Sequence, residues 1–376
     1  MMARSERGRR TWLEVALERL DWPLLSIIVM LASVGIINLY SAAQAADGPS
    51  YHVSQAIAFT LGMGVVGVLT FLDTRLYERW AYVLYVLILG LLALVLAIGT
   101  ELNGSKRWLN LGVFLMQPSE LLKIGVILIT ARFFHDHDQD EPYSLSQLAK
   151  LFALVGVGVV FVLQQPDLGT SLTILAIFMT MVLFQGVRTA SIITMVTAVV
   201  MATPLVWTFG MKEYQKDRVR SFLALEQDAY GQDWQVRQSI IAFGSGRLWG
   251  KGYLEGTQIQ KGFVPEHEND FAAANWGEEH GFAGMLFLLS VYMALIMRGM
   301  RVATRARSRF AVHVAVGMSA FIFWHVMVNL GMVTGMLPVV GLPLPLMSYG
   351  RSNLMTVMLG LGLLMNVSAQ ARAQRL

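Results

Sequence analysis

The chain has 376 residues, of which 55% are apolar and 14% are charged, and its formal net charge is +4. A soluble domain carries roughly 25% charged residues, so this composition, with a mean hydropathy of +0.54, indicates an integral membrane protein. The lack of cysteine excludes a disulfide framework and a thiolate metal site. The basic residues form no patch with interleaved aromatic residues, which argues against nucleic-acid binding.

The N-terminal region is basic and precedes an apolar run from Leu24 to Tyr40. A cleavable signal peptide has an apolar region of roughly 7 to 15 residues, which is shorter than this run. The sequence therefore predicts a cytoplasmic N-terminus, residues 1–22, followed by an uncleaved first span.

Apolar segments recur along the whole chain. A hydrocarbon core of about 30 Å requires roughly 20 apolar residues in a helix. We therefore predict an all-α membrane protein with about ten transmembrane helices. The segments are Leu24–Tyr40, Val53–Leu72, Trp80–Ile98, Val113–Phe134, Leu148–Leu163, Leu168–Phe184, Ala190–Trp207, Phe271–Met297, Phe310–Met332 and Leu354–Val367.

The basic residues predict the orientation, because short cytoplasmic loops retain Lys and Arg. The arginines between Arg298 and Arg309 place that connection in the cytoplasm, and an even number of spans then places both termini there. We predict a single membrane domain, residues 1–376, with one large external loop between helices 7 and 8, residues 208–269. The acidic run His135–Glu141 is interpreted as a solvated loop rather than a metal site.

Polar residues of unusual type gather on the external side. Arg107 beside Trp108 suits an anionic headgroup, because a guanidinium holds phosphate oxygens in a bidentate fork; an interfacial Trp is also common in any membrane protein. Glu120 and Lys123 are three residues apart and share a helix face, as a packing ion pair or as substrate contacts. Asp167 fits the N-cap of the following helix as well as a substrate contact.

Two further external segments are candidate parts of a pocket. The long loop combines glycines with basic residues that include Lys251, and such a loop either wraps a phosphorylated ligand or is simply solvated. The stretch Asn329–Ser352 holds three prolines and four glycines. Irregular backbone at membrane depth survives only when it is buried in protein or lines a cavity, so we expect this stretch to form a pocket wall.

Asp270 directly precedes the predicted span that begins at Phe271, and Glu266, Glu268, Glu278 and Glu279 are nearby in the sequence. Neighbouring carboxylates at a low-dielectric boundary raise one another's pKa, which poises a base near neutral pH. The structural alternative is a helix N-cap. Asp270 is the candidate catalytic residue.

The chain resembles the SEDS family (shape, elongation, division and sporulation), and its RodA branch more than its FtsW branch. The order and spacing of the matching stretches cover nearly the whole chain. They are NGSKRWLNLGVFLMQPSELLK from Asn103, QQPDLGTS from Gln164, QSIIAFGSG from Gln238, GKGYLEGTQIQKGFVPE from Gly250, DFAAANWGEE from Asp270, and NLGMVTGMLPVVGLPLPLMSYG from Asn329.

The resemblance implies a peptidoglycan glycosyltransferase that polymerises lipid II on the outer face of the bacterial cytoplasmic (inner) membrane, for cell elongation and rod shape. Its partners would be a class B penicillin-binding protein and other elongation machinery. The family's catalytic aspartate corresponds to Asp270 and its essential tryptophan to Trp108. Its conserved polar channel positions correspond to Arg107, Glu120, Lys123 and Asp167.

The sequence departs from the family pattern at two places. Before the eighth span, the family's His and Thr are replaced by Glu268 and Asn269, and the glycine that usually follows Ser-Tyr-Gly is Arg351. Arg351 is bulky where a glycine lets backbones approach, and it offers a cation for pyrophosphate. We expect Lys251, Ser348 and Arg351 to contact the substrate.

The predicted reaction is an inverting glycosyl transfer in which Asp270 takes a proton from an acceptor hydroxyl, while Arg107 and Lys123 stabilise the departing pyrophosphate. No ligand cluster demands a metal, although a divalent cation such as Mg²⁺ or Mn²⁺ could share that task. Two alternatives stay open, a lipid II flippase and a non-catalytic scaffold for a penicillin-binding protein.

Overall fold

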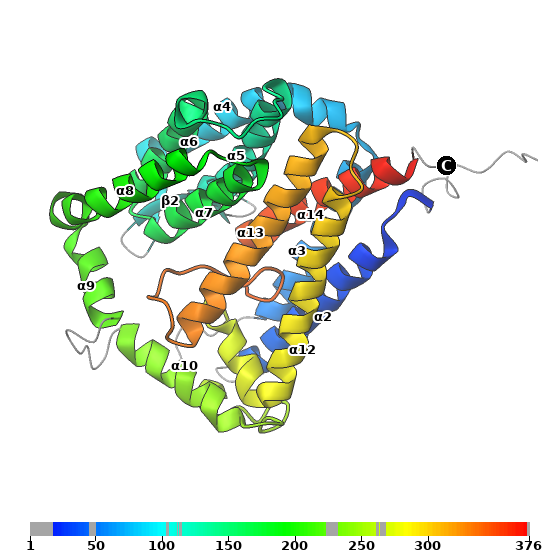
Figure 1. Ribbon diagram of the computed structural model, residues 1–376. Coiled ribbons are helices and arrows are strands. Elements are labelled where there is room, and N and C mark those ends of the chain that lie inside the picture. The colour runs from blue at the N-terminus through cyan, green and yellow to red at the C-terminus, as the bar shows by residue number, and fades with distance from the viewer. Residues whose placement is uncertain are drawn as a thin grey trace, which may run out of the picture.

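The structure, a computed structural model, describes residues 18–44, 50–102, 105–110, 112, 115–222, 232–260, 263 and 268–373. The predicted cytoplasmic segment up to residue 17, residues 103, 104, 111, 113 and 114 of the stretch from Asn103, and residues 261, 262 and 264–267, which include Glu266, lie outside this described part. Long helices form a bundle, and a small sheet lies in one connection (Figure 1). The long helices are α2 (Trp22–Gln44), α3 (Tyr51–Phe71), α4 (Thr74–Ile98), α5 (Pro118–Asp136), α6 (Leu145–Gln164), α7 (Leu168–Gln185), α8 (Thr189–Leu205), α12 (Ala272–Ala303), α13 (Arg309–Val333) and α14 (Arg351–Ala373).

Among the described residues, nine helices are long and apolar enough to cross a membrane, so the chain is a multi-pass membrane protein. They match nine of the predicted segments. The tenth predicted segment corresponds to α5, which is 19 residues long and carries Glu120, Lys123 and Arg132. Whether α5 makes a tenth span therefore stays a prediction.

The helix α5 begins later than the sequence suggested. The apolar run starts at Val113, but Leu115–Met116 forms strand β3, and the helix begins at Pro118. Proline suits a first helical position because its missing N–H would have no partner there. Strand β3 pairs with β2 (Ser105–Asn110), which also pairs with β1 (Thr100–Leu102), so the α4–α5 connection is an antiparallel sheet of order β1-β2-β3.

Two apolar clusters make up the core, and they meet at α5. Its residues Ile124 and Ile127 pack with α2, α3, α12, α13 and α14, whereas Leu122 and Val126 pack with α4, α6 and α7. All but four of the 19 residues of α5 are buried. The charged residues in its first two turns are therefore enclosed by protein rather than by lipid.

The described part of the predicted external loop contains helices. The π-helical turn η1 (Val206–Gly210) continues α8, so this span runs past Trp207, where the apolar segment was expected to end. Three helices follow, α9 (Glu213–Phe222), α10 (Gln232–Gly246) and α11 (Thr257–Gln260). In Figure 1, α9 and α10 run along the edge of the bundle from α8 towards α12. The Ser239 hydroxyl donates to the carbonyl of Val333 at 2.7 Å and fastens α10 to α13.

A glycine kink lets α10 pack against the start of α12. Gly281 has φ 62°, which interrupts the helical backbone of α12 and suits glycine because it lacks a Cβ. A Cβ at this position would lie 2.3 Å from the backbone nitrogen of Gly250, so no other residue fits without movement. The first turns of α12 are thereby held against the external segment.

Candidate functional site

Asp167 connects the sheet to the start of α7. It is the N-cap of α7, since its side chain accepts hydrogen bonds from the backbone N–H of Thr170 at 3.1 Å and from the Thr170 hydroxyl at 2.9 Å. The guanidinium of Arg107, on β2, lies 3.7 Å from the Asp167 carboxylate and donates to the carbonyls of Gln165 and Pro166. The N-cap interpretation of Asp167 is confirmed. Arg107 lies beside this cap and contacts the residues just before α7.

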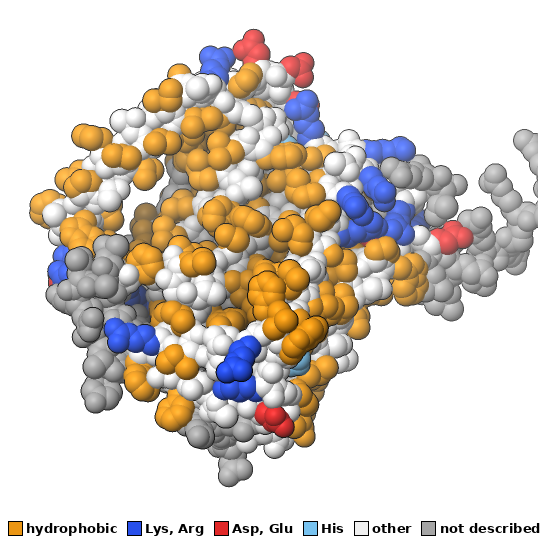
Figure 2. Space-filling model, turned by 60° about the horizontal axis from the view of Figure 1, so that its bottom comes forward, with side chains coloured by type: hydrophobic (Ala, Val, Ile, Leu, Met, Phe, Trp, Pro, Cys, Tyr) orange, Lys and Arg blue, Asp and Glu red, His pale blue; other side chains and the backbone are white. Residues whose placement is uncertain are grey.

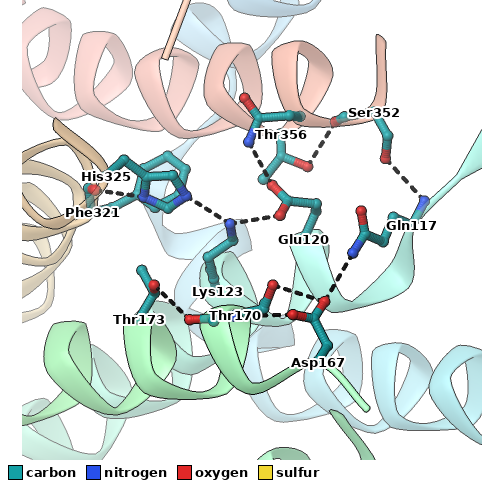
Figure 3. Close-up of polar contacts among 12 residues, drawn as sticks. Gln117, Glu120, Lys123, Asp167, Thr170, Thr173, Phe321, His325, Ser352 and Thr356 are labelled. Carbon is teal, nitrogen blue, oxygen red and sulfur yellow. Dashed lines mark hydrogen bonds and ion pairs between the residues drawn. The ribbon is translucent and has the colours of Figure 1, made fainter. Parts of the chain in front are cut away.

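Glu120 and Lys123 form an ion pair inside the bundle. The Lys123 ammonium lies 2.7 Å from Glu120 Oε1 and 2.8 Å from Nε2 of His325 on α13 (Figure 3). Because an ammonium only donates, His325 accepts through Nε2. Its Nδ1 then carries the proton and donates to the carbonyl of Phe321 at 2.9 Å. The geometry therefore specifies a neutral imidazole. The Lys123 side chain is 0% exposed, which favours the packing-pair interpretation over direct contact with substrate.

The start of α14 is bound to this cluster. The Asn353 amide donates to Glu120 Oε2 at 2.8 Å, so both oxygens of that carboxylate have partners. The backbone N–H of Gln117 donates to the Ser352 hydroxyl at 2.9 Å, and the Gln117 side chain donates to Asp167 at 3.2 Å. These bonds join the starts of α5, α7 and α14 into one polar cluster, much of which is drawn in Figure 3.

Asp270 lies directly before the start of α12. The cap position of the helix is Phe271, so Asp270 is one residue outside it. The Asn329 side chain on α13 donates to the backbone carbonyl of Asp270 at 2.8 Å and to that of Leu342 at 2.7 Å. Asp270 is half-buried, and its Oδ2 would lie 3.3 Å from a Cβ placed on Gly341. Asn329 therefore anchors the Asp270 backbone next to the connection between α13 and α14.

The end of that connection also contacts the segment just before Asp270. The Tyr349 backbone N–H donates to the carbonyl of Glu268 at 2.8 Å, two residues before Asp270. Residues 334–350 are irregular, as the prolines and glycines of the stretch predicted, whereas its first five residues complete α13. The connection thus lies between Asp270 on one side and the start of α14 on the other.

A pocket adjoins the same connection. It offers about 410 Å³ of space, part of which is open solvent, and its lining includes Arg107, Asp167, Arg218 and Val340. Val340 precedes Gly341, where an added Cβ would lie 3.3 Å from Asp270 Oδ2. The expectation that the Asn329–Ser352 stretch forms a pocket wall is therefore met at residues 338–340. Two arginines in the lining make the pocket suited to an anion.

Four further residues were predicted to contact the substrate, and none of them lines the pocket beside Arg107. Lys251 pairs with the buried carboxylate of Glu278 on α12, which also accepts from the N–H of Gln258 at 3.0 Å. The Ser348 hydroxyl accepts from the N–H of Leu344 at 2.9 Å and stabilises the connection. Arg351 is exposed at the start of α14. Trp108 is half-buried on β2, opposite Thr100.

Three residues that the sequence did not single out belong to this region, namely His325, Asn329 and Asn353. Each is buried on one of the long membrane helices, α13 or α14. Polar side chains inside membrane spans cost free energy and are retained for a partner or a function. Their occurrence in membrane helices was therefore the sequence signal that could have identified them. Their partners could not be inferred, because each contact joins segments distant in the chain.

No metal centre is formed by the described residues, since none of their His, Asp and Glu side chains form a group of three or more that could hold an ion. The cation suggested for the pyrophosphate therefore stays a prediction. The acidic residues of the run His135–Glu141 pair with arginines instead, as Asp138 does with Arg309.

Comparison with known families and proteins gives consistent matches along the chain. The family model described as "Cell cycle protein", for FtsW, RodA and SpoVE, matches residues 21–373. The chain is 39% identical to the peptidoglycan glycosyltransferase MrdB of Escherichia coli over 348 residues, which cover 93% of each protein. It is 32% identical to the stage V sporulation protein E of Bacillus subtilis, over 94% of this chain and 98% of that protein.

Solved structures show the same fold. A chain of a peptidoglycan synthase complex, described for its coordination of polymerization and crosslinking, superimposes with a TM-score of 0.79 and 31% identity, over 94% of this chain and 98% of that one. The rod shape determining protein RodA of Thermus thermophilus gives a TM-score of 0.69 and 30% identity, over 93% and 96% of the two chains.

Proposed function

Because the chain belongs to the FtsW, RodA and SpoVE family, we infer that it is a peptidoglycan glycosyltransferase, the activity for which its relatives are named. The structural likeness to a chain of a peptidoglycan synthase complex supports this function. The fold supplies a membrane bundle with a polar cluster at one end, as a lipid-linked substrate requires.

We propose that the substrate is lipid II and that Asp270 is the general base. Its carboxylate takes the proton from a sugar hydroxyl of the acceptor, and that oxygen bonds to the anomeric carbon of the donor. The bond from that carbon to the pyrophosphate oxygen breaks, the pyrophosphate leaves with the electron pair, and the centre is inverted. Water then accepts the proton from Asp270. A general base contributes about 10²- to 10⁴-fold.

The observation that carries this proposal is the anchoring of Asp270 beside a cationic pocket. Asn329 fixes the Asp270 backbone, and Gly341, against the Asp270 carboxylate, follows pocket-lining Val340. Arg107 lines the same pocket, and its side chain is 28% exposed, so its guanidinium is accessible to a pyrophosphate. Lys123 is fully buried and acts by holding Glu120.

The proposed setting is the outer face of the bacterial inner membrane, with a class B penicillin-binding protein and other elongation proteins as partners. The likeness to a peptidoglycan synthase complex supports such a partner. The arginines from Arg298 to Arg309 support the orientation, because short cytoplasmic connections retain Lys and Arg.

Polymerisation of labelled lipid II by the purified protein with its partner tests the proposal. We expect glycan chains from the wild type, none from Asp270→Asn, and near wild-type amounts from the matched control Glu268→Gln, which removes a carboxylate two residues away. Full chain synthesis by Asp270→Asn would refute the base assignment. Flipping of lipid II in liposomes without polymer would favour the transporter instead.

A further inference from the structure

A second pocket lies at the other end of α12, away from Asp270. It is a shallow site of about 300 Å³, part of which is open solvent, between α2, α12 and α14, and its lining consists of three arginines, one aspartate, one serine and two small apolar residues. Arg298 and Arg305 lie near the C-terminal end of α12, and Arg372 lies in the last turn of α14. This is the end of the bundle predicted to face the cytoplasm.

The positive charge of this pocket exceeds what its one acid can neutralise. Asp21 is fully buried, and its carboxylate accepts from Arg298 at 2.6 Å and lies 3.3 Å from Arg372. Ser368 donates to its second oxygen. Arg305 is exposed and forms no ion pair with any described residue. The pocket therefore keeps at least one arginine available for an anion.

The surroundings of the pocket restrict the kind of anion. Val302 and Ala371 give it an apolar wall, and Met297 and Met300, on the same end of α12, are exposed. Figure 2 shows Lys and Arg side chains gathered next to apolar side chains on this side of the molecule. A ligand that fits has a phosphate for the arginines and an acyl chain for the apolar surface beside them.

We propose that this pocket binds the headgroup phosphate of an anionic phospholipid from the cytoplasmic leaflet. Basic pockets between membrane helices on that side suit such headgroups, and a guanidinium forms strong charge-assisted bonds with phosphate oxygens. This binding is independent of Asp270 and of glycan synthesis. It assigns a lipid ligand to the end of the bundle opposite the site of polymerisation.

Native mass spectrometry of the protein released from bilayers of phosphatidylglycerol and phosphatidylcholine tests the proposal. We expect the wild type to retain phosphatidylglycerol preferentially, and Arg305→Gln to reduce that occupancy about fivefold, the effect of one basic residue near an anionic surface. The matched control is Arg79→Gln, which removes an exposed arginine at the start of α4, on the same predicted side. It should retain the wild-type occupancy.

A folding control separates binding from stability. Arg305 has no ion pair among the described residues, so Arg305→Gln should unfold at the wild-type temperature in neutral detergent. Equal retention of phosphatidylglycerol by wild type and Arg305→Gln would overturn the proposal. A loss of a co-purifying protein from Arg305→Gln with unchanged lipid occupancy would assign the pocket to a protein contact and would overturn it as well.

Discussion

At the scale of single residues, the buried Glu120–Lys123 pair shows how a charge is kept inside the bundle. Lys123 has three partners: the carboxylate of Glu120, the imidazole of His325, and the ring of Phe321, whose centroid is 5.4 Å from the ammonium. Desolvation opposes each charge alone, and only the pairing offsets it. The pair therefore stabilises the contact between α5, α13 and α14.

Removing one member of the pair should be worse than removing both. We predict that Lys123→Met lowers the free energy of unfolding by roughly 3 kcal/mol, because Glu120 is left as a buried charge. The double variant Glu120→Gln, Lys123→Met should recover most of that loss. Thermal unfolding in detergent, followed by intrinsic tryptophan fluorescence, measures both. Equal stability of the single and double variants would contradict the packing role.

The candidate site was only partly predictable at this scale. The three-residue spacing of Glu120 and Lys123 placed them on one helix face, and the N-cap was one of the two interpretations left open for Asp167. The contact of Lys123 with His325 spans 202 positions, and that of Glu120 with Asn353 spans 233. No local pattern encodes such pairings, because they depend on how whole helices pack.

At the scale of elements, the connection between α13 and α14 positions Asp270. Gly341 has φ 72°, which costs other residues about 1 to 2 kcal/mol, and a Cβ there would meet the Asp270 carboxylate at 3.3 Å. We predict that Gly341→Ala lowers lipid II polymerisation more than Gly335→Ala. Gly335 has φ 75° in the same connection, but its Cβ would meet the side chains of Ile240 and Val236 on α10 rather than Asp270.

Both glycine variants carry a similar backbone penalty, so their unfolding temperatures should fall together while their polymerisation rates differ. Polymerisation is measured with labelled lipid II at equal amounts of folded protein. Equal rates for the two variants would show that the close approach of Gly341 to Asp270 has no role in catalysis.

Asp21 joins the ends of α2, α12 and α14, and its ionisation makes this junction sensitive to acid. Burial alone would raise the pKa of Asp21, but hydrogen bonds from Ser368 and Arg298 outweigh that effect and lower it below its ordinary value. A lowered pKa in the folded state means that the stabilisation is complete above the unfolded-state pKa, about 4. It is lost as the pH falls through the folded-state value.

We therefore predict that the unfolding temperature of the wild type falls steeply below about pH 4. Asp21→Asn should be less stable than the wild type at pH 7, and its unfolding temperature should fall less over the same acid range. A pH series of thermal unfolding in detergent measures both. If the unfolding temperatures of the two proteins fell equally below pH 4, Asp21 would be excluded as a source of the acid sensitivity.

The sequence predicted membrane helices better than it predicted their connections. The lengths of the apolar segments were enough to locate the nine helices that are long and apolar enough to cross a membrane among the described residues. The sequence placed the start of α5 too early, because Leu115 and Met116 belong to a strand and the helix begins at Pro118. The helices α9 and α10 were not predicted, since they are short and polar and are held by contacts with the bundle.

At the scale of the whole molecule, α5 is the element around which the two apolar clusters assemble. Composition predicted a helical membrane bundle, but which helices become central depends on packing between segments far apart in the chain. By contrast, Ser191 is the single buried residue of α8, and this helix lies at the edge of the bundle (Figure 1). That difference separates helices that hold the site from helices that face lipid.

The predicted orientation can be measured directly, because the chain has no cysteine. We predict that Glu255→Cys, exposed on the external side, is labelled by a membrane-impermeant maleimide in intact cells. Arg307→Cys, exposed in the connection between α12 and α13, should be labelled only after the membrane is permeabilised. The opposite pattern would invert the topology and place Asp270 in the cytoplasm.

The central claim is that the Asp270 carboxylate accepts the proton of the attacking sugar hydroxyl. The most direct measurement is lipid II polymerisation by Asp270→Ala with its partner, with and without added formate, a small carboxylate that fits the space left by the side chain. We predict a loss of at least about 100-fold and partial recovery with formate. Polymerisation at the wild-type rate without formate would contradict the account.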